Sequence, residues 1–164
     1  MSTLPDYRTI LYASDLGKHT RPVFRHAVSL ARQTGARIVM LHVVEPLGTT
    51  GRAVLGAYLP DLDVGKIEHE GMRDLIGRMK ERLYKFCRDE SDACDQGSAL
   101  VSEVTVGSGL PSEVIMETAK AHHADLIVMG SCTHGLFGHR GIGSTARKVT
   151  QHSDIPVLLV PNLG

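Results

Sequence analysis

The stretch RIVMLHVV at residues 37–44 is apolar at almost every position, and this pattern decides the fold class. A strand with one face in water alternates apolar and polar residues, whereas a strand covered on both faces is apolar throughout. Strands of the second kind occur in parallel sheets that carry helices on both faces. Residues 37–44 therefore predict a strand inside an α/β sheet.

Further strands and helices alternate along the chain around residues 37–44. Short apolar segments predict four more strands, at residues 8–14 (RTILYAS), 100–106 (LVSEVTV), 125–130 (DLIVMG) and 155–160 (IPVLLV). Apolar residues at helical spacing predict helices over 20–35 and 64–88, and two more that begin at Pro111 and near Ser144. Residues 45–63 hold several Gly and Pro without a clear period, and they predict a loop with room for one helical turn. This order predicts a single domain, residues 1–164, built on an open five-stranded parallel sheet with helices on both faces.

The charges of the chain balance, which disfavours two classes of partner. The 164 residues include 18 Lys and Arg against 18 Asp and Glu, so the formal net charge at pH 7 is zero. A sequence-independent binder of nucleic acid or of an anionic membrane usually has a basic excess, so neither partner is expected. The chain starts without a secretory pattern, has no apolar run long enough to span a membrane, and its 3 cysteines lack disulfide spacing. These features are typical of a cytoplasmic protein.

One segment departs from this balance. Residues 126–153 contain no acidic residue, but they include Arg140, Arg147 and Lys148. The same segment holds a Gly-rich loop between a strand and a helix, where backbone N–H groups can bind phosphate. Ser14 and Asp15 end another strand, and ligands of open parallel sheets bind beyond such strand ends. The sequence therefore predicts a site for a small anion near these two strand ends.

Common nucleotide and catalytic motifs do not explain this site. The loop has no GxxxxGK[ST] motif, and its GxxGxG at residues 138–143 does not follow the first strand, as a dinucleotide fingerprint would. No Ser-His-Asp or Cys-His set can be argued from spacing, so covalent catalysis is not indicated and enzymatic activity stays open. His42 is interpreted as an interior or site-lining histidine rather than a catalyst.

The Gly-rich loop and four other segments resemble the universal stress protein family. Nucleotide-binding members share G-x2-G-x9-G-[ST] after the fourth strand, and Gly130, Thr133, Gly143 and Ser144 stand at that spacing. The other matching segments are ILYASD (10–15), LHVVE (41–45), VGSGLPSEVI (106–115) and ARKVTQHSDIPVLLVP (146–161). The resemblance covers about residues 7–161 and is weak over 46–66.

This resemblance implies a Rossmann-like sheet of strand order 3-2-1-4-5 and a homodimer joined through the fifth strand, whose apolar edge would otherwise be exposed. It also implies a stress-response protein that binds ATP or AMP as a regulatory module at the switch point between strands 1 and 4, with slow ATP hydrolysis as the upper limit of any enzymatic activity. A divalent ion, Mg or Mn, can accompany the phosphates, although no residue is assigned to hold a metal. The residues implied for adenine and ribose are Ala13, Ser14, Asp15 and Val43, and those implied for ribose and phosphates are Gly130, Thr133, Arg140, Gly143 and Ser144.

Thr133 departs from the family pattern, which has Gly at this position. A Cβ costs about 1–3 kcal/mol where the backbone needs a positive φ or a close approach to phosphate. Arg140 can equally be a phosphate ligand or a solvated surface charge. The alternative function is therefore a family member that binds no nucleotide and acts through contact with an unidentified protein partner.

Overall fold

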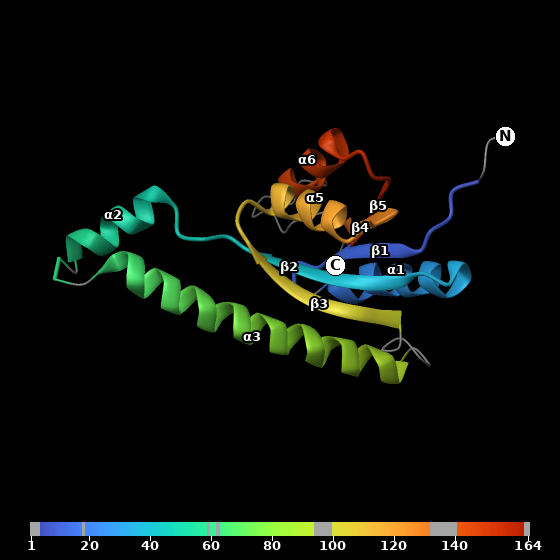
Figure 1. Ribbon diagram of the computed structural model, residues 1–164, viewed down its shortest axis with the longest axis horizontal. Coiled ribbons are helices and arrows are strands. Elements are labelled where there is room, and N and C mark those ends of the chain that lie inside the picture. The colour runs from blue at the N-terminus through green and yellow to red at the C-terminus, as the bar shows by residue number, and fades with distance from the viewer. Residues whose placement is uncertain are drawn as a thin grey trace.

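A five-stranded parallel sheet forms the centre of the molecule (Figure 1). The computed structural model describes residues 4–17, 19–58, 60–61, 63–93, 100–131 and 141–162. The strand order of the sheet is β3-β2-β1-β4-β5, and all neighbouring strands are parallel. The predicted fold class and strand order are confirmed. The strands are β1 (Thr9–Ala13), β2 (Arg37–Val44), β3 (Val101–Ser108), β4 (Leu126–Gly130) and β5 (Val157–Val160).

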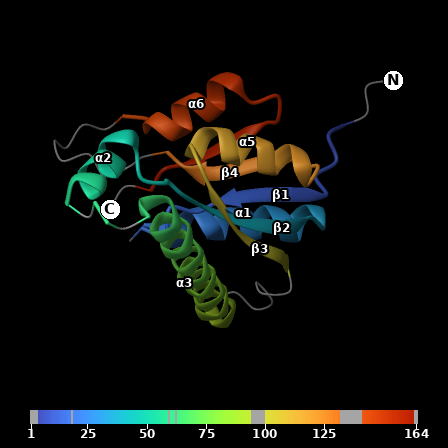
Figure 2. The same ribbon diagram turned by 60° about the vertical axis from the view of Figure 1, so that its left-hand side comes forward.

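Helices cover both faces of the sheet (Figure 2). On one face lie α1 (Thr20–Thr34) and α3 (Val64–Ala93), and on the other lie α5 (Pro111–Ala121) and α6 (Ser144–His152). Met40 of β2 belongs to the hydrophobic cluster on the α1 side, whereas Leu41 belongs to the cluster on the α5 side. Successive side chains of β2 are therefore buried in opposite layers, which explains why the buried residues 38–41 are all apolar.

Local sequence signals account for the bounds of two helices. The buried face of α1 is formed by Val23, Phe24, Ala27, Val28 and Ala31, which recur at steps of three and four residues. The helix ends at Gly35, whose φ of 75° is left-handed and therefore suits glycine. Pro111 opens α5, where its missing N–H and fixed φ cost the helix nothing.

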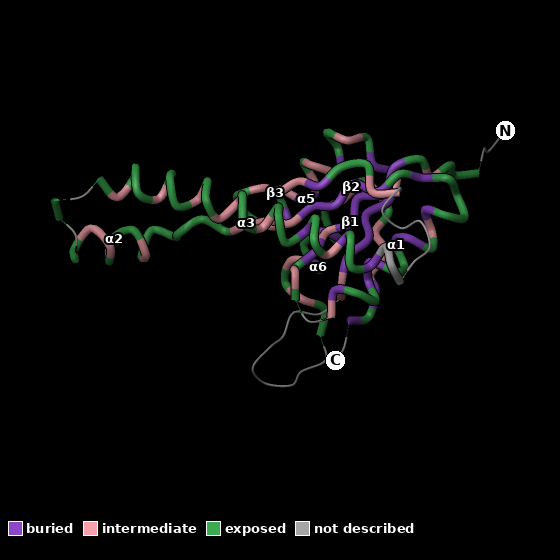
Figure 3. Tube along the Cα trace, turned by 90° about the horizontal axis from the view of Figure 1, so that it is seen from below, coloured by how far each residue is buried: buried purple, intermediate pink, exposed green. Residues whose placement is uncertain are grey.

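An arm formed by α2 (Thr49–Tyr58) and the first half of α3 extends beyond the sheet (Figures 1 and 3). With 30 residues, α3 is about 45 Å long, whereas the 8 residues of β3 span about 26 Å. Among the described side chains of α3, only Leu83, Cys87 and Glu90 are buried, and all three lie in its C-terminal half. None of the described helices, α3 included, is both long and apolar enough to cross a membrane.

The prediction of a loop for residues 45–63 is wrong, because 10 of these residues form α2. No residue of α2 is buried, so nothing in its sequence needs to repeat at the helical period. An ion pair between Arg52 Nε and Glu68 Oε2, 2.9 Å long, joins α2 to α3. The predicted end of α3 at residue 88 is also too early, since the helix continues to Ala93.

Glu90 fixes the C-terminal half of α3 to α1. Its carboxylate is only 2% exposed and lies 2.9 Å from Arg21 Nε and 3.2 Å from Arg25 Nε. A buried carboxylate is stable when it is paired in this way. The ion pairs therefore hold α3 against the sheet at one end, while its other end carries the arm.

Candidate functional site

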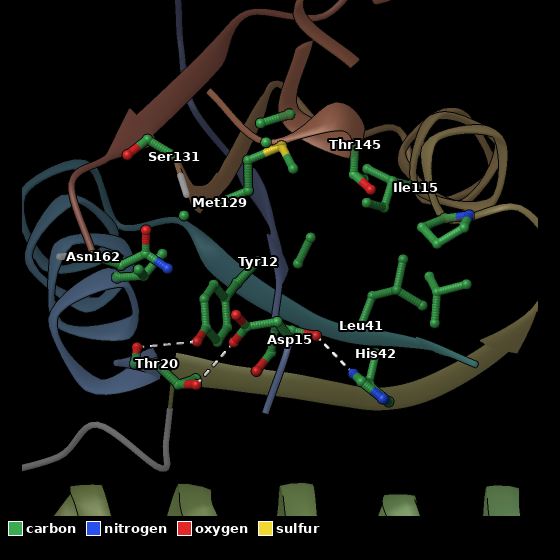
Figure 4. A pocket seen from close by; sticks show the side chains of 18 of the residues that line it. Tyr12, Asp15, Thr20, Leu41, His42, Ile115, Met129, Ser131, Thr145 and Asn162 are labelled. Atoms are coloured by element: carbon green, nitrogen blue, oxygen red, sulfur yellow. Dashed lines mark hydrogen bonds between the residues drawn. The ribbon is translucent and has the colours of Figure 1, made fainter. Parts of the chain in front are cut away.

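A cavity of about 290 Å³ opens beyond the carboxyl ends of β1, β2 and β4 (Figure 4). The chain leaves β1 toward the α1 face and leaves β4 toward the α6 face, so this is the point where the sheet changes its winding direction. Ligands of open α/β sheets bind at such points. The volume is close to the lower bound of about 300 Å³ for small-molecule sites.

One side of the cavity is an apolar wall, formed by Leu41, Val43, Pro111, Ile115 and Met129. Val43 lies among the partly buried last residues of β2, beyond Leu41, and Pro111 and Ile115 come from the first turns of α5. The wall continues the hydrophobic cluster on the α5 side of the sheet, which contains Leu41, Ile115 and Met129. Such a surface suits a flat apolar group, because it offers contact area without requiring charged partners.

Asp15 also lines the cavity, from the turn that joins β1 to α1. Its Oδ1 accepts hydrogen bonds from the Gly17 N–H at 2.9 Å and from the Thr20 hydroxyl at 3.1 Å. Between Asp15 and Gly17, Leu16 has a φ of 56°, in the left-handed region that branched residues rarely adopt. The turn is thus strained and held by several hydrogen bonds, as is typical of backbone at functional sites.

The ring side chains of His42 and Tyr12 contact the backbone of this turn and of the start of α1. His42 Nδ1 lies 2.7 Å from the carbonyl oxygen of Ser14, and the Tyr12 hydroxyl donates to the Thr20 carbonyl at 3.2 Å (Figure 4). Burial raises the pKa of the Tyr12 hydroxyl far above its usual range, so this donor keeps its proton at neutral pH. Both side chains line the cavity.

The start of α6 faces the cavity from the third side. Gly143, Thr145 and Ala146 line it, and no side chain caps the helix at Gly143. The first N–H groups of a helix have no partner within the helix and carry partial positive charge. The Gly143 N–H itself donates to the Ser131 carbonyl at 2.9 Å, which fixes the helix start to the end of β4. This end of the cavity therefore suits an anionic group.

Asn162 is a lining residue of the cavity that the sequence did not predict. It follows β5, is only 4% exposed and lines the cavity, and its amide lies so close to Gly130 that a Cβ there would meet it. The Ser131 N–H donates to the Val160 carbonyl at 2.9 Å, so the chain after β5 stays close to the end of β4. An Asn two residues beyond a predicted strand carries no pattern, and only the three-dimensional fold brings it to Gly130.

The charged side chains of the described lining are acidic. Asp15 and Glu45 are its carboxylates and His42 is its imidazole, whereas none of the described lining residues is Lys or Arg. The described part of the chain also contains no group of three or more His, Cys, Asp or Glu side chains that could hold a metal ion. The positive potential on the described side of the cavity therefore comes from the backbone of α6.

The structure brings most of the predicted site residues together. The cavity is lined by Ala13, Ser14, Asp15, Val43, Gly130 and Gly143. Ser144 begins α6 and is exposed, and it is not among the lining residues. Thr133 and Arg140 lie outside the described residues. The lining residues Glu45, Thr145 and Asn162 were not predicted as site residues, although Glu45 ends the matching segment LHVVE.

Solved structures and curated proteins with this architecture are numerous. A universal stress protein of Thermus aquaticus is 29% identical over 154 residues, which cover 94% of this chain and 98% of the relative. A universal stress protein in complex with cAMP superposes with a TM-score of 0.58 at 20% identity, over 96% of this chain and 99% of that one. The Archaeoglobus fulgidus universal stress protein in complex with dAMP superposes with a TM-score of 0.51 at 22% identity. The superposition covers 94% of this chain and 98% of that one.

The structural similarities are below 25% identity, so they show a shared fold. The family itself is shown by sequence: the model of the universal stress protein family matches residues 6–161, nearly the whole chain. This match includes the strands, the turn at Asp15 and the start of α6 that surround the cavity. The chain belongs to the universal stress protein family.

Proposed function

We propose that this protein is a cytoplasmic stress-response module that binds an adenine mononucleotide, ATP or AMP, in the cavity between β1 and β4. The observation that supports the proposal is the arrangement of three different surfaces around one cavity: the apolar wall, the Asp15 carboxylate and the uncapped start of α6. These surfaces match the three parts of a nucleotide, which are an apolar base, a ribose with hydroxyl donors, and phosphates. Relatives of the same fold form complexes with cAMP and dAMP.

In this proposal each surface has one task. The base lies against the apolar wall near the backbone of Val43, and Asp15 accepts hydrogen bonds from the ribose hydroxyls. The phosphates lie at the N–H groups that begin α6, near Gly143 and Ser144, with Gly130 close to the ribose. Since the described lining has no basic side chain, any Mg or Mn would be held by the phosphates, and we assign no protein ligand to it.

We further propose a homodimer through β5. This strand is at the edge of the sheet and pairs only with β4 in the described chain. Its residues Val157, Leu158 and Leu159 are apolar and half-buried. An apolar edge with unpaired backbone groups pairs readily with another strand.

The binding proposal is tested by analysing the purified protein for nucleotide. The protein is denatured, and the supernatant is separated by ion-pair chromatography to quantify ATP, ADP, AMP and GTP. Titration calorimetry of nucleotide-free protein with ATP, AMP and GTP then measures affinity and base preference. We expect an adenine nucleotide near one per chain, or micromolar binding of ATP or AMP with GTP weaker. Absence of both bound nucleotide and measurable binding contradicts the proposal.

A second candidate function, contact with a protein partner in the absence of nucleotide, is favoured by the arm. In α2, Val54 is 51% exposed and Tyr58 is 82% exposed, and the helix contains no buried residue. Apolar side chains on a projecting helix are suited to contact with another molecule. If calorimetry shows no nucleotide binding, while substitution of Val54 and Tyr58 by Ser abolishes function in cells, the second candidate replaces the first.

A further inference from the structure

Both backbone polar groups of Ser14 have partners on β2. The Ser14 N–H donates to the Leu41 carbonyl at 2.8 Å, and the Ser14 carbonyl oxygen lies 2.7 Å from Nδ1 of His42. A carbonyl oxygen only accepts hydrogen bonds, so Nδ1 of His42 carries the proton. His42 belongs to a strand paired on both sides, by β1 and β3, and its ring is therefore a fixed donor rather than a mobile one.

The orientation of the peptide group between Ser14 and Asp15 determines where the Asp15 carboxylate points. Oδ1 is already bound by the Gly17 N–H and the Thr20 hydroxyl, whereas Oδ2 accepts no hydrogen bond within the part of the chain that the structure describes. Gly17 stays close to the carboxylate, since a Cβ at this position would lie 3.2 Å from either carboxylate oxygen. Within the described residues, Asp15 therefore has one oxygen bound by its own turn and one, Oδ2, that is open to a ligand.

Strain in the same turn requires a support of this kind. Leu16 follows Asp15 with a φ of 56°, a conformation that persists only when its surroundings enforce it. Its side chain packs against the hydrophobic cluster on the α1 side, and its N–H donates to the Ser14 hydroxyl at 3.1 Å. The carbonyl of Ser14 precedes Asp15 in the chain, and the His42 ring lies 2.7 Å from its oxygen.

We propose that His42 is a positioning residue of the nucleotide site: it holds the Ser14 carbonyl and thereby aims Oδ2 of Asp15 at the ribose hydroxyls. This inference rests on the proposed function, because it concerns the same cavity. In this proposal His42 does not contact the nucleotide. Its effect is transmitted through Asp15, and this makes it distinguishable from a general loss of packing.

The test compares ATP with 2′,3′-dideoxy-ATP, which lacks the ribose hydroxyls, by titration calorimetry. We expect the natural protein to bind ATP about tenfold more tightly, since hydrogen bonds to a charged carboxylate are among the stronger ones. The variant His42→Leu removes the ring donor, and we expect the ratio to fall to about twofold. His42→Asn keeps an N–H donor near the position of Nδ1, and we expect it to retain most of the preference. Asp15→Asn serves as the reference for a site without the carboxylate.

Several results would overturn the inference. If His42→Leu weakens ATP and dideoxy-ATP by the same factor, or if His42→Asn loses the preference as His42→Leu does, the role of His42 is only structural. A natural protein that binds both nucleotides equally overturns the inference while the proposed function stands. A natural protein that binds neither overturns both. If circular dichroism shows that His42→Leu is unfolded, His42→Gln replaces it, because its donor lies near the position of Nε2 instead.

Discussion

Gly130 and Asn162 fit together so closely that a methyl group at position 130 would lie 2.6 Å from Nδ2 and 2.9 Å from Cγ of the amide. Asn162 is only 4% exposed, so its side chain has little space to move away. The first glycine of the Gly-rich loop is therefore required by contact with the protein itself, in addition to any role toward a ligand.

This contact predicts that Gly130→Ala destabilises the fold and that a second substitution, Asn162→Ala, restores part of the lost stability. Gly130→Ala should lower the free energy of unfolding by about 1–3 kcal/mol, because it overpacks a closed space. Asn162→Ala removes the clashing atoms, so the double variant should be more stable than the sum of the two single effects. Urea denaturation of the four proteins measures this coupling. Additive losses would show that the two residues do not constrain each other.

A pair of substitutions at Gly143 should separate folding from phosphate binding. Gly143 precedes α6 with φ −58° and ψ 155°, which any residue can adopt, and its position at the N-cap favours Asp and Asn. Gly143→Asp should preserve or raise the melting temperature, yet weaken ATP binding by about tenfold or more, because its charge repels phosphate. Gly143→Asn, which caps without charge, is the matched control and should bind ATP more tightly than Gly143→Asp. Equal affinities of the two variants for ATP would argue against phosphates at the start of α6.

The free edge of β5 gives a test of the dimer. The carbonyls of Pro156 and Val160 accept from β4, so in a parallel ladder the N–H groups of Val157 and Leu159 point away from β4. Leu159→Pro removes one of these outward donors without removing a bond to β4. We expect it to raise the dimer dissociation constant at least tenfold in sedimentation experiments, compared with Leu159→Ala as the control for the shortened side chain. A Leu159→Pro dimer as stable as the Leu159→Ala dimer would exclude pairing through this edge.

Cys87 should make stability fall at alkaline pH. Burial raises the pKa of its thiol from its ordinary value to about 11, although nearby Arg88 opposes the shift. The unfolded chain then loses this proton at a lower pH than the folded chain, so stability is fully present below about pH 9 and is lost as the pH rises toward 11. Denaturation of Cys87→Ala over this range should show a smaller decrease than the natural protein. The comparison uses the slopes with pH, since the substitution also changes packing.

The fold was predictable from sequence where burial leaves a pattern. Residues 37–44 are apolar because both faces of β2 are covered, and the buried face of α1 repeats at helical steps. Helix α2 buries nothing, so its residues show no period and it was interpreted as a loop. Among site residues, the end of β1 and the Gly-rich loop are marked by motifs and position. Asn162 and the strained conformation of Leu16 are not, because both depend on contacts between distant segments.

The overhang of α3 has a mechanical consequence. Among the described side chains of α3, the buried residues Leu83, Cys87 and Glu90 lie near one end of the helix. At its other end is the arm, in which no residue of α2 is buried. A tilt of about 10° around the held end would displace the far end of a helix about 45 Å long by about 8 Å. Tyr58, at the end of α2, is 82% exposed, and a fluorescent label there would not disturb the core. If a change at the Glu90 ion pairs tilted α3, the distance from Tyr58 to the sheet would therefore change by an amount that energy transfer can measure.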